Sequence, residues 1–264
     1  MKQADTSCRS ICLFRLIARC IGLSIIVVEK LLYEGVGLTH IDNLAVFVEN
    51  SCDEDVLKIE ITGANKNFAR AKILEIITPS KYRTKEKFCA LSNVCGGCQW
   101  SFIDYKHQLE VKKQIIEEAL RKVLPENVKV LPTIPCKDVS QFRHKIQLPV
   151  SQTKNSKRFL IGYFKPQTHE IVNIKHCEIQ PKFLDEIIEF IRLEAQELGI
   201  VAYNEKNHNG VLRHVVFRVS QDTNETLLTF VLNSDKIDQK IKNLAKFLSE
   251  KFNNIVGVCA NFNT

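Results

Sequence analysis

Residues 56–77 read VLKIEITGANKNFARAKILEII, two apolar runs separated by the turn residues Gly63, Ala64 and Asn65. Runs rich in Val, Ile, Leu and Phe that are bounded by Gly, Asn or Asp predict strands. We therefore predict strands over 56–62 and 68–77, after two similar runs at 24–32 and 45–48. Short strands packed into about 55 residues indicate a small closed barrel, because closure removes exposed strand edges.

The chain changes character after Pro79-Ser80, where a basic linker follows the barrel. Helical spacing of apolar residues alternates from there with strand-like runs, which predicts a mixed α+β domain. The expected helices cover 105–123, 181–198 and 235–251, and the expected strands cover 142–150, 159–164, 171–174, 211–219, 226–232 and 255–259. We predict three segments: an N-terminal extension over 1–23, a barrel over 24–79 and a second, incomplete domain over 80–264.

The sequence of the N-terminal extension does not have the pattern of a membrane span. Arg15 and Arg19 interrupt its apolar run, and the uncharged piece from Cys20 to Val28 is short against the roughly 20 residues that a span needs. An organelle-targeting helix and an incidental extension both remain open. The net charge of +7 permits an anionic partner, although mild basicity alone is common. We expect a cytoplasmic protein without a membrane partner.

Ten cysteines without a convincing signal peptide point to reduced or metal-bound thiols. The segment from Cys89 to Cys98 reads CALSNVCGGC, so three thiols lie within ten residues, and two glycines let the loop turn tightly. Structural zinc favours two separated Cys-x-x-Cys pairs, whereas an iron–sulfur cluster takes clustered thiolates and a distant fourth. Candidates for the fourth ligand are Cys8, Cys12, Cys20, Cys52, Cys136, Cys177 and Cys259. Cys177 lies between a predicted strand and a predicted helix, where a loop could deliver it.

Several ordered motifs make the chain resemble the bacterial RNA (uracil-5-)-methyltransferases that carry an N-terminal TRAM domain and a 4Fe-4S cluster. The motifs are LLYEGVGL at 31–38, CALSNVCGGCQ at 89–99, FRHK at 142–145, IGYFK at 161–165, HCEIQ at 176–180 and LRH at 212–214. The resemblance implies an OB-like TRAM barrel that binds RNA, and a cluster held by Cys89, Cys95, Cys98 and Cys177. It also implies methyl transfer from S-adenosylmethionine to C5 of a uridine in ribosomal RNA, with the cluster outside the redox chemistry.

The chain departs from this family at its catalytic motifs. The Asp-Pro-Pro-Arg sequence beside the family's nucleophilic cysteine does not occur, nor does a Gly-rich cofactor loop. We therefore expect that the C-terminal Rossmann-like methyltransferase domain is absent, that the catalytic half is missing and that the chain is inactive alone. A separate chain could supply that half. No catalytic or S-adenosylmethionine-binding residue is predicted, and neither Cys136 nor Cys259 is expected to be the nucleophile.

Basic residues interleaved with aromatic residues are typical of single-stranded RNA binding, although many such aromatics simply pack in a core. The residues that we predict to contact RNA are Arg70, Lys72, Arg143, Lys145, Lys165 and Arg213.

Two other functions stay open. A stand-alone RNA-binding iron–sulfur module would have lost catalysis, and a radical methylthiotransferase would combine TRAM with iron–sulfur chemistry. The latter uses Cys-x3-Cys-x2-Cys and a C-terminal TRAM domain, so it ranks lower.

Overall fold

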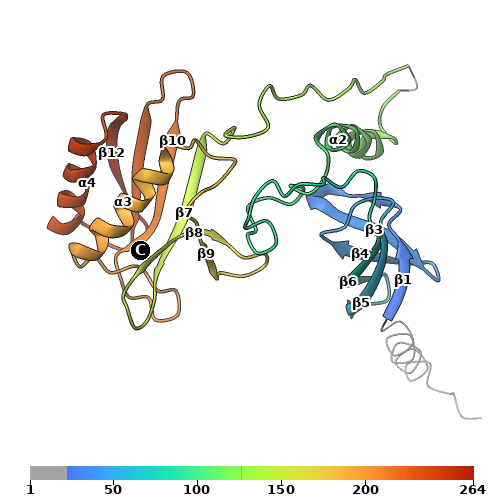
Figure 1. Cartoon of the computed structure of the whole chain (residues 1–264), viewed down its shortest axis with the longest axis horizontal. Coiled ribbons are helices and arrows are strands. Elements are labelled where there is room, and N and C mark those ends of the chain that lie inside the picture. The colour runs from blue at the N-terminus through green and yellow to red at the C-terminus, as the bar shows by residue number, and fades with distance from the viewer. Residues whose placement is uncertain (1–22, 126) are drawn as a thin grey trace, which may run out of the picture. The chain divides into compact units, whose positions relative to one another are not determined.

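The computed structural model describes residues 23–125 and 127–264, so the predicted extension lies almost entirely outside the described residues. The chain forms two compact units that are interleaved in sequence (Figure 1). Unit 1 contains the residues up to Lys87 together with Gln99–Pro135, and unit 2 contains Phe88–Cys98 together with Cys136–Thr264. No helix in the described ranges is long and apolar enough to cross a membrane.

Unit 1 is built on a six-stranded sheet with the order β1-β5-β6-β4-β3-β2. The strands are β1 (Leu23–Val27), β2 (Lys30–Leu31), β3 (Val36–Ile41), β4 (Leu44–Glu49), β5 (Val56–Ala64) and β6 (Phe68–Thr78). Their pairings are antiparallel except for β4 with β6, which is parallel. Asp42 and Asn43 adopt positive φ angles of 49° and 66° between β3 and β4, the conformation that a tight two-residue hairpin requires.

The sheet of unit 1 closes through the bend between β1 and β2. The Val28 amide donates to the Asp55 carbonyl at 2.9 Å, and the Glu29 amide donates to the Leu38 carbonyl at 2.9 Å. One bent strand therefore bonds to both ends of the sheet, as in an OB-type barrel. Small and branched side chains fill the interior, namely Ile26, Val28, Val46, Val48, Leu57, Ile59, Ala69 and Ala71.

Helix α2 (Tyr105–Leu120) packs on this barrel, although its sequence position suggested the second domain. Val111 and Ile103 share a small core with Leu31 and Cys52 of the barrel, and the short helix η1 (Tyr33–Gly35) precedes β3. The Asp104 side chain caps α2 by accepting from the Lys106 and His107 amides. The amphipathic pattern of 105–123 predicts a helix, but the surface that it covers depends on these tertiary contacts.

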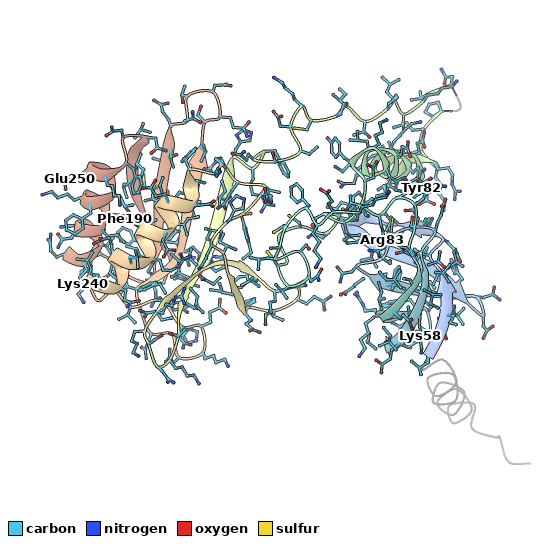
Figure 2. The ribbon with its side chains drawn as sticks, in the orientation of Figure 1. Lys58, Tyr82, Arg83, Phe190, Lys240 and Glu250 are labelled. Atoms are coloured by element: carbon cyan, nitrogen blue, oxygen red, sulfur yellow. The ribbon has the colours of Figure 1, made fainter. Side chains whose placement is uncertain are left out.

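Buried polar contacts fix the chain after β6 to the barrel. The Asp55 side chain is fully buried and accepts from Arg83 Nε at 2.8 Å and Arg83 Nη2 at 2.7 Å. It also accepts from the Cys52 and Ser80 amides at 2.7 Å and 2.8 Å. Figure 2 labels Arg83 and its neighbour Tyr82, whose ring stacks on His107 with centroids 3.5 Å apart.

Unit 2 is a second six-stranded sheet, with the order β12-β11-β10-β7-β8-β9. Its elements are β7 (Lys145–Gln152), β8 (Phe159–Phe164), β9 (Ile171–Asn173), α3 (Leu184–Glu197), β10 (Leu212–Val219), β11 (Thr226–Leu232), α4 (Gln239–Lys251) and β12 (Ile255–Phe262). Only β11 and β12 pair in parallel, across the α4 connection. Both helices share one core with the inward residues of the sheet, including Phe159, Phe217 and Phe230.

Element boundaries in unit 2 differ from the predicted ones at helix starts. Helix α4 begins at Gln239, four residues after the predicted start, and Asp238 Oδ1 caps it by accepting from the Ile241 amide at 2.9 Å. Helix α3 begins at Leu184 and ends before Gly199, whose φ is +62°. Phe190 of α3 (Figure 2) packs edge-on against Phe252, which follows α4, with ring centroids 5.5 Å apart.

Candidate metal centre and RNA-binding surface

Residues 88–98 form an irregular segment of unit 2, here called the thiol loop. The Cys95 amide donates to the Leu91 carbonyl at 2.9 Å, and Leu91 packs against the main core. The Gly96 amide donates to the Phe164 carbonyl at 2.9 Å. A Cβ at Gly96 would lie 2.8 Å from that carbonyl oxygen, so glycine permits the close approach of the loop to the end of β8.

Cys177 reaches the same unit from the turn between β9 and α3. The turn is held by backbone bonds to the segment before β7: the Gln141 amide donates to Glu178 at 2.8 Å, and the Arg143 amide donates to Ile179 at 2.9 Å. Cys177 itself packs on the edge of the core. Its neighbour His176 has both ring nitrogens beside carboxylates, Asp185 at 2.5 Å and Glu178 at 3.3 Å.

The four cysteines with predicted ligand roles lie within electrostatic reach of one another. Burial, with the neighbouring Cys177, Cys95 and Cys89 as further causes, raises the pKa of Cys98 to about 11. Burial is also the main cause that raises the pKa of Cys177, with Cys89 and Cys95 as further causes. All four are half-buried. We call Cys89, Cys95, Cys98 and Cys177 the thiol cluster, since the fold collects them from two distant parts of the chain.

The other described cysteines are placed differently. Cys52 is fully buried in unit 1, where burial is the main cause that raises its pKa to about 12. Cys136 and Cys259 are exposed. The fourth-ligand candidates Cys8, Cys12 and Cys20 lie outside the described residues. Among the alternatives in the described ranges, Cys177 is the one whose charge acts on Cys98.

The donor set of the thiol cluster is all sulfur. Within residues 23–125 and 127–264, no three His, Cys, Asp or Glu side chains lie close enough together to hold a single metal ion. A single zinc ion needs four donors around one centre. The thiolates of a 4Fe-4S cluster bind different irons and therefore stand further apart. Four cysteine thiols are the donor type that iron–sulfur clusters use, and the ligand role of these four stays a prediction.

Two neighbours of the thiol cluster were not predicted as part of it. The ring of Tyr163 borders the thiol loop, because a Cβ on Gly97 would lie 3.6 Å from ring carbons. The guanidinium carbon of Arg143 lies 5.6 Å from the centroid of that ring. Positive charge on Arg143 lowers the pKa of Cys95 and Cys98, opposing the stronger effect of burial. The IGYFK and FRHK motifs contain these residues, but strand pairing was needed to bring them to the thiols.

The predicted RNA contacts in unit 1 are already paired with acids. Lys72 lies 2.6 Å from Glu60, and Arg70 lies 4.0 Å from Glu49. Both basic side chains are more than half exposed, at 58% for Lys72 and 60% for Arg70. Exposed pairs of this kind contribute little stability and can exchange for phosphate. The structure places these residues on β6, and their predicted role in RNA binding stays a prediction.

The predicted RNA contacts in unit 2 do not form a single group. Lys165 pairs with Glu170 at 2.6 Å, and Arg213 donates to the Asn263 carbonyl at 2.7 Å while its guanidinium covers the Tyr203 ring. Lys145 is exposed at the start of β7 and pairs across strands with Arg218 of β10. Sequence analysis missed Arg218, since only the strand register reveals that two exposed cations stand opposite each other.

Comparisons with known proteins relate most of the chain to one class of enzyme, although no family model matches it. The chain is 34% identical over 232 residues to an uncharacterised RNA methyltransferase of Clostridium acetobutylicum, which covers 87% of this chain. It is 30% identical over 240 residues to an uncharacterised RNA methyltransferase of Bacillus cereus, which covers 90%. Its homologues are RNA methyltransferases. The chain spans about half the length of the curated relatives it matches, 50% and 52% for these two.

A solved structure shares the fold of this RNA methyltransferase relative. It is the crystal structure of Pyrococcus abyssi tRNA (uracil-54, C5)-methyltransferase in complex with S-adenosyl-L-homocysteine. The match has a TM-score of 0.63 and 24% sequence identity, and covers 83% of this chain and 48% of that chain. At this identity the likeness concerns the fold, so it carries over no residue role.

Two predictions are corrected by these matches. The expected fold class counted the methyltransferase fold as absent, and that absence is wrong, because 83% of the chain matches the fold of a methyltransferase structure. The expected function, an RNA- and cluster-binding part with the catalytic half missing or a stand-alone module, is wrong for the same reason and because 87% of the chain aligns with an RNA methyltransferase. An inactive chain and a separate catalytic partner have no support. The lack of short catalytic motifs was a poor test for the absence of the methyltransferase fold, because the match to the solved structure is a match of fold.

Proposed function

We propose that the chain acts as an RNA (uracil-5-)-methyltransferase, which transfers a methyl group from S-adenosylmethionine to C5 of a uridine. Similarity to RNA methyltransferases along nearly nine tenths of the chain supports the reaction class. The fold likeness to a uracil-C5 enzyme with bound S-adenosyl-L-homocysteine supports the target atom and the methyl donor. Ribosomal RNA is the proposed substrate, the barrel is the proposed TRAM domain, and a cytoplasmic location is proposed with them.

We propose RNA contacts through basic residues of both units. Arg70 and Lys72 on β6 and Lys145, Lys165 and Arg213 in unit 2 are exposed or half-buried cations. Phosphate neutralisation by such side chains supplies affinity without sequence preference. Tyr203 beneath Arg213 and Phe164, which stacks on His169 with centroids 5.0 Å apart, offer aromatic surfaces near two of these cations. Aromatic faces beside cations suit unpaired bases of folded RNA.

The thiol cluster is the proposed site of a 4Fe-4S cluster held by Cys89, Cys95, Cys98 and Cys177. The single observation that carries this part is the convergence of four half-buried thiols from two segments of unit 2. When bound, the group would join the thiol loop to the turn before α3 and would take no part in methyl transfer. Burial favours the neutral thiols of Cys95, Cys98 and Cys177, so metal coordination is needed to keep these three deprotonated.

The methyl-transfer proposal can be tested with tritiated S-adenosylmethionine and two substrates, ribosomal RNA and transfer RNA. The expected result is tritium in 5-methyluridine after digestion of ribosomal RNA, with less in transfer RNA. Label that enters transfer RNA instead would keep the reaction and change the substrate. Label in another nucleoside, or none in either RNA, would contradict the proposed function.

The cluster proposal needs anaerobic purification, metal analysis and an absorption spectrum. About four irons per chain and a broad band near about 400 nm are expected for four-cysteine ligation. Cys177→Ala should lose the iron or hold it weakly. Cys259→Ala is the matched control, because Cys259 is exposed on β12 and is not among the residues whose charges act on the thiol cluster. One zinc and no visible band would reject the cluster while leaving methyl transfer testable.

A further inference from the structure

Arg143 is tied to the turn that carries Cys177. Its amide donates to the Ile179 carbonyl at 2.9 Å, and two residues earlier the Gln141 amide donates to Glu178 at 2.8 Å. Gln141 adopts a positive φ of 52°, which bends the chain just before this contact. The backbone of Arg143 is therefore fixed on one side of the proposed cluster site, independently of what its side chain binds.

The side chain of Arg143 lies over the ring of Tyr163. The guanidinium carbon lies 5.6 Å from the Tyr163 ring centroid, within the range of a cation–π contact. The same ring borders Gly97 between Cys95 and Cys98. Tyr163 is thus a spacer between the cation and the loop, and burial raises the pKa of its phenol to about 12, so the ring stays neutral.

The ion pairs formed by the described residues do not include Arg143. The groups whose charges interact with it include Cys95, Cys98 and Tyr163. A cation without an acid partner, whose charge acts on Cys95 and Cys98, has one evident electrostatic use. Four thiolates give an iron–sulfur cluster a negative total charge, and its more reduced form is more negative still. Nearby positive charge stabilises that reduced form most, especially where water is partly excluded.

We propose that Arg143 is a positioning residue of the cluster site, whose guanidinium rests on Tyr163 and offsets the charge of the four thiolates. This inference depends on the proposed 4Fe-4S cluster. Arg143 raises the reduction potential of the cluster and slows its loss, whether or not RNA is bound. This role differs from the phosphate contact that the sequence suggested, because it requires no RNA.

The test is a reductive titration of the anaerobically purified protein with dithionite, without RNA. Dithionite supplies one electron to the cluster, no bond breaks, and the loss of visible absorbance reports the midpoint potential. Arg143→Gln should move the midpoint to more negative potential and shorten the lifetime of the cluster under an iron chelator. Arg143→Lys, which keeps the charge, should stay close to wild type.

Arg158→Gln is the matched control, because Arg158 is an exposed arginine of the same unit and does not act on the thiols. An unchanged midpoint in Arg143→Gln, or an equal shift in Arg158→Gln, would overturn the proposal. If Arg143→Gln does not fold, Tyr163→Leu serves instead: loss of the ring should shift the midpoint in the same direction, and no shift would reject the role. A wild-type protein without iron would reject the cluster itself, which is a separate result.

Discussion

Residues 79–83 of unit 1 and the thiol loop of unit 2 are both irregular segments fixed to a sheet, but different chemistry holds them. Asp55 in unit 1 is fully buried and receives hydrogen bonds from Arg83, Ser80 and Cys52. The thiol loop is held by a glycine contact with β8 and brings three half-buried thiols toward Cys177. In residues 79–83 the attachment to the sheet therefore consists of hydrogen bonds between atoms of the protein itself.

The difference concerns what each attachment needs from outside the chain. A buried carboxylate with a guanidinium and two amide donors is electrically satisfied. The thiol cluster has no comparable bond, because burial favours the neutral thiols of Cys95, Cys98 and Cys177, and thiolates bind a metal while neutral thiols do not. The attachment in unit 1 is therefore complete without a ligand, whereas the thiol loop would be strengthened by the proposed cluster.

The largest effect is expected from Asp55→Ala in unit 1. The change leaves Arg83, which is only 15% exposed, without its carboxylate. Loss of one partner of a buried pair costs about 3–5 kcal/mol. Trp100 is the single tryptophan and lies in unit 1, so urea unfolding followed by its fluorescence measures this loss. Glu75→Ala, an exposed acid on β6, is the control, and a similar small loss in both variants would refute the charge-based attachment.

A second, smaller effect is expected from Gly96→Ala in the thiol loop. The new methyl group would lie 2.8 Å from the Phe164 carbonyl oxygen, and overpacking of this kind costs about 1–3 kcal/mol. The thiol loop should move away from β8, and the thiols should react faster with an alkylating reagent. Gly63→Ala is matched, because its methyl group would meet nothing within 4 Å. Equal alkylation rates in the two variants would show that the glycine contact does not hold the loop.

RNA binding gives a third way to separate the units. Lys145→Gln should weaken RNA binding more than Lys72→Gln, because Lys72 is already paired with Glu60 at 2.6 Å and Lys145 stands opposite Arg218. Removal of one phosphate contact lowers the slope of log affinity against log salt by about 1. Affinity measured at several salt concentrations gives that slope. A larger loss for Lys72→Gln would assign the main phosphate contacts to unit 1.

The smallest effect concerns acid stability of unit 2. Burial, with Arg213 as the second cause, lowers the pKa of His214 from its ordinary value of 6.5. The unfolded state therefore binds a proton more readily, so stability is complete above the ordinary pKa and falls as pH drops below it. His214→Gln should remove part of that loss, less than about 1 kcal/mol. Circular dichroism during urea unfolding at about pH 7.5 and about pH 5.5 measures it. An unchanged pH dependence in the variant would exclude His214.

The local sequence pattern predicted strands and helices more readily than it predicted the segments with which they pair or pack. Alternating apolar residues place strands at 56–62 and 68–77, and β5 and β6 contain both ranges. The same pattern could not show that the bend at Val28 closes the barrel, because that requires hydrogen bonds to residues about ten and about thirty positions away. Nor could it assign α2 to unit 1, since the choice depends on a small core with Leu31 and Cys52.

The candidate metal centre likewise has one part that the sequence shows and another that only the folded structure shows. Three thiols within ten residues are visible in the sequence, whereas the reach of Cys177, the ring of Tyr163 and the cation of Arg143 depend on the pairing of the 141–143 and 178–179 segments. The likeness to a methyltransferase fold is also tertiary. Ordered motifs along the sequence indicated the resemblance to RNA methyltransferases, whereas the expected absence of the fold rested on short catalytic motifs, which test only a few residues.

The interleaving of the two units sets an order of events during protein synthesis. The thiol loop leaves the ribosome before residues 99–135 of unit 1, and Cys177 follows later still. At about 5–20 residues per second, roughly 80 residues separate Cys98 from Cys177 by on the order of 4–16 s. During that interval three reactive thiols are already made while their fourth companion is not. From the synthesis of Cys89 until unit 2 is complete, oxidants or other metal ions can therefore react with these thiols.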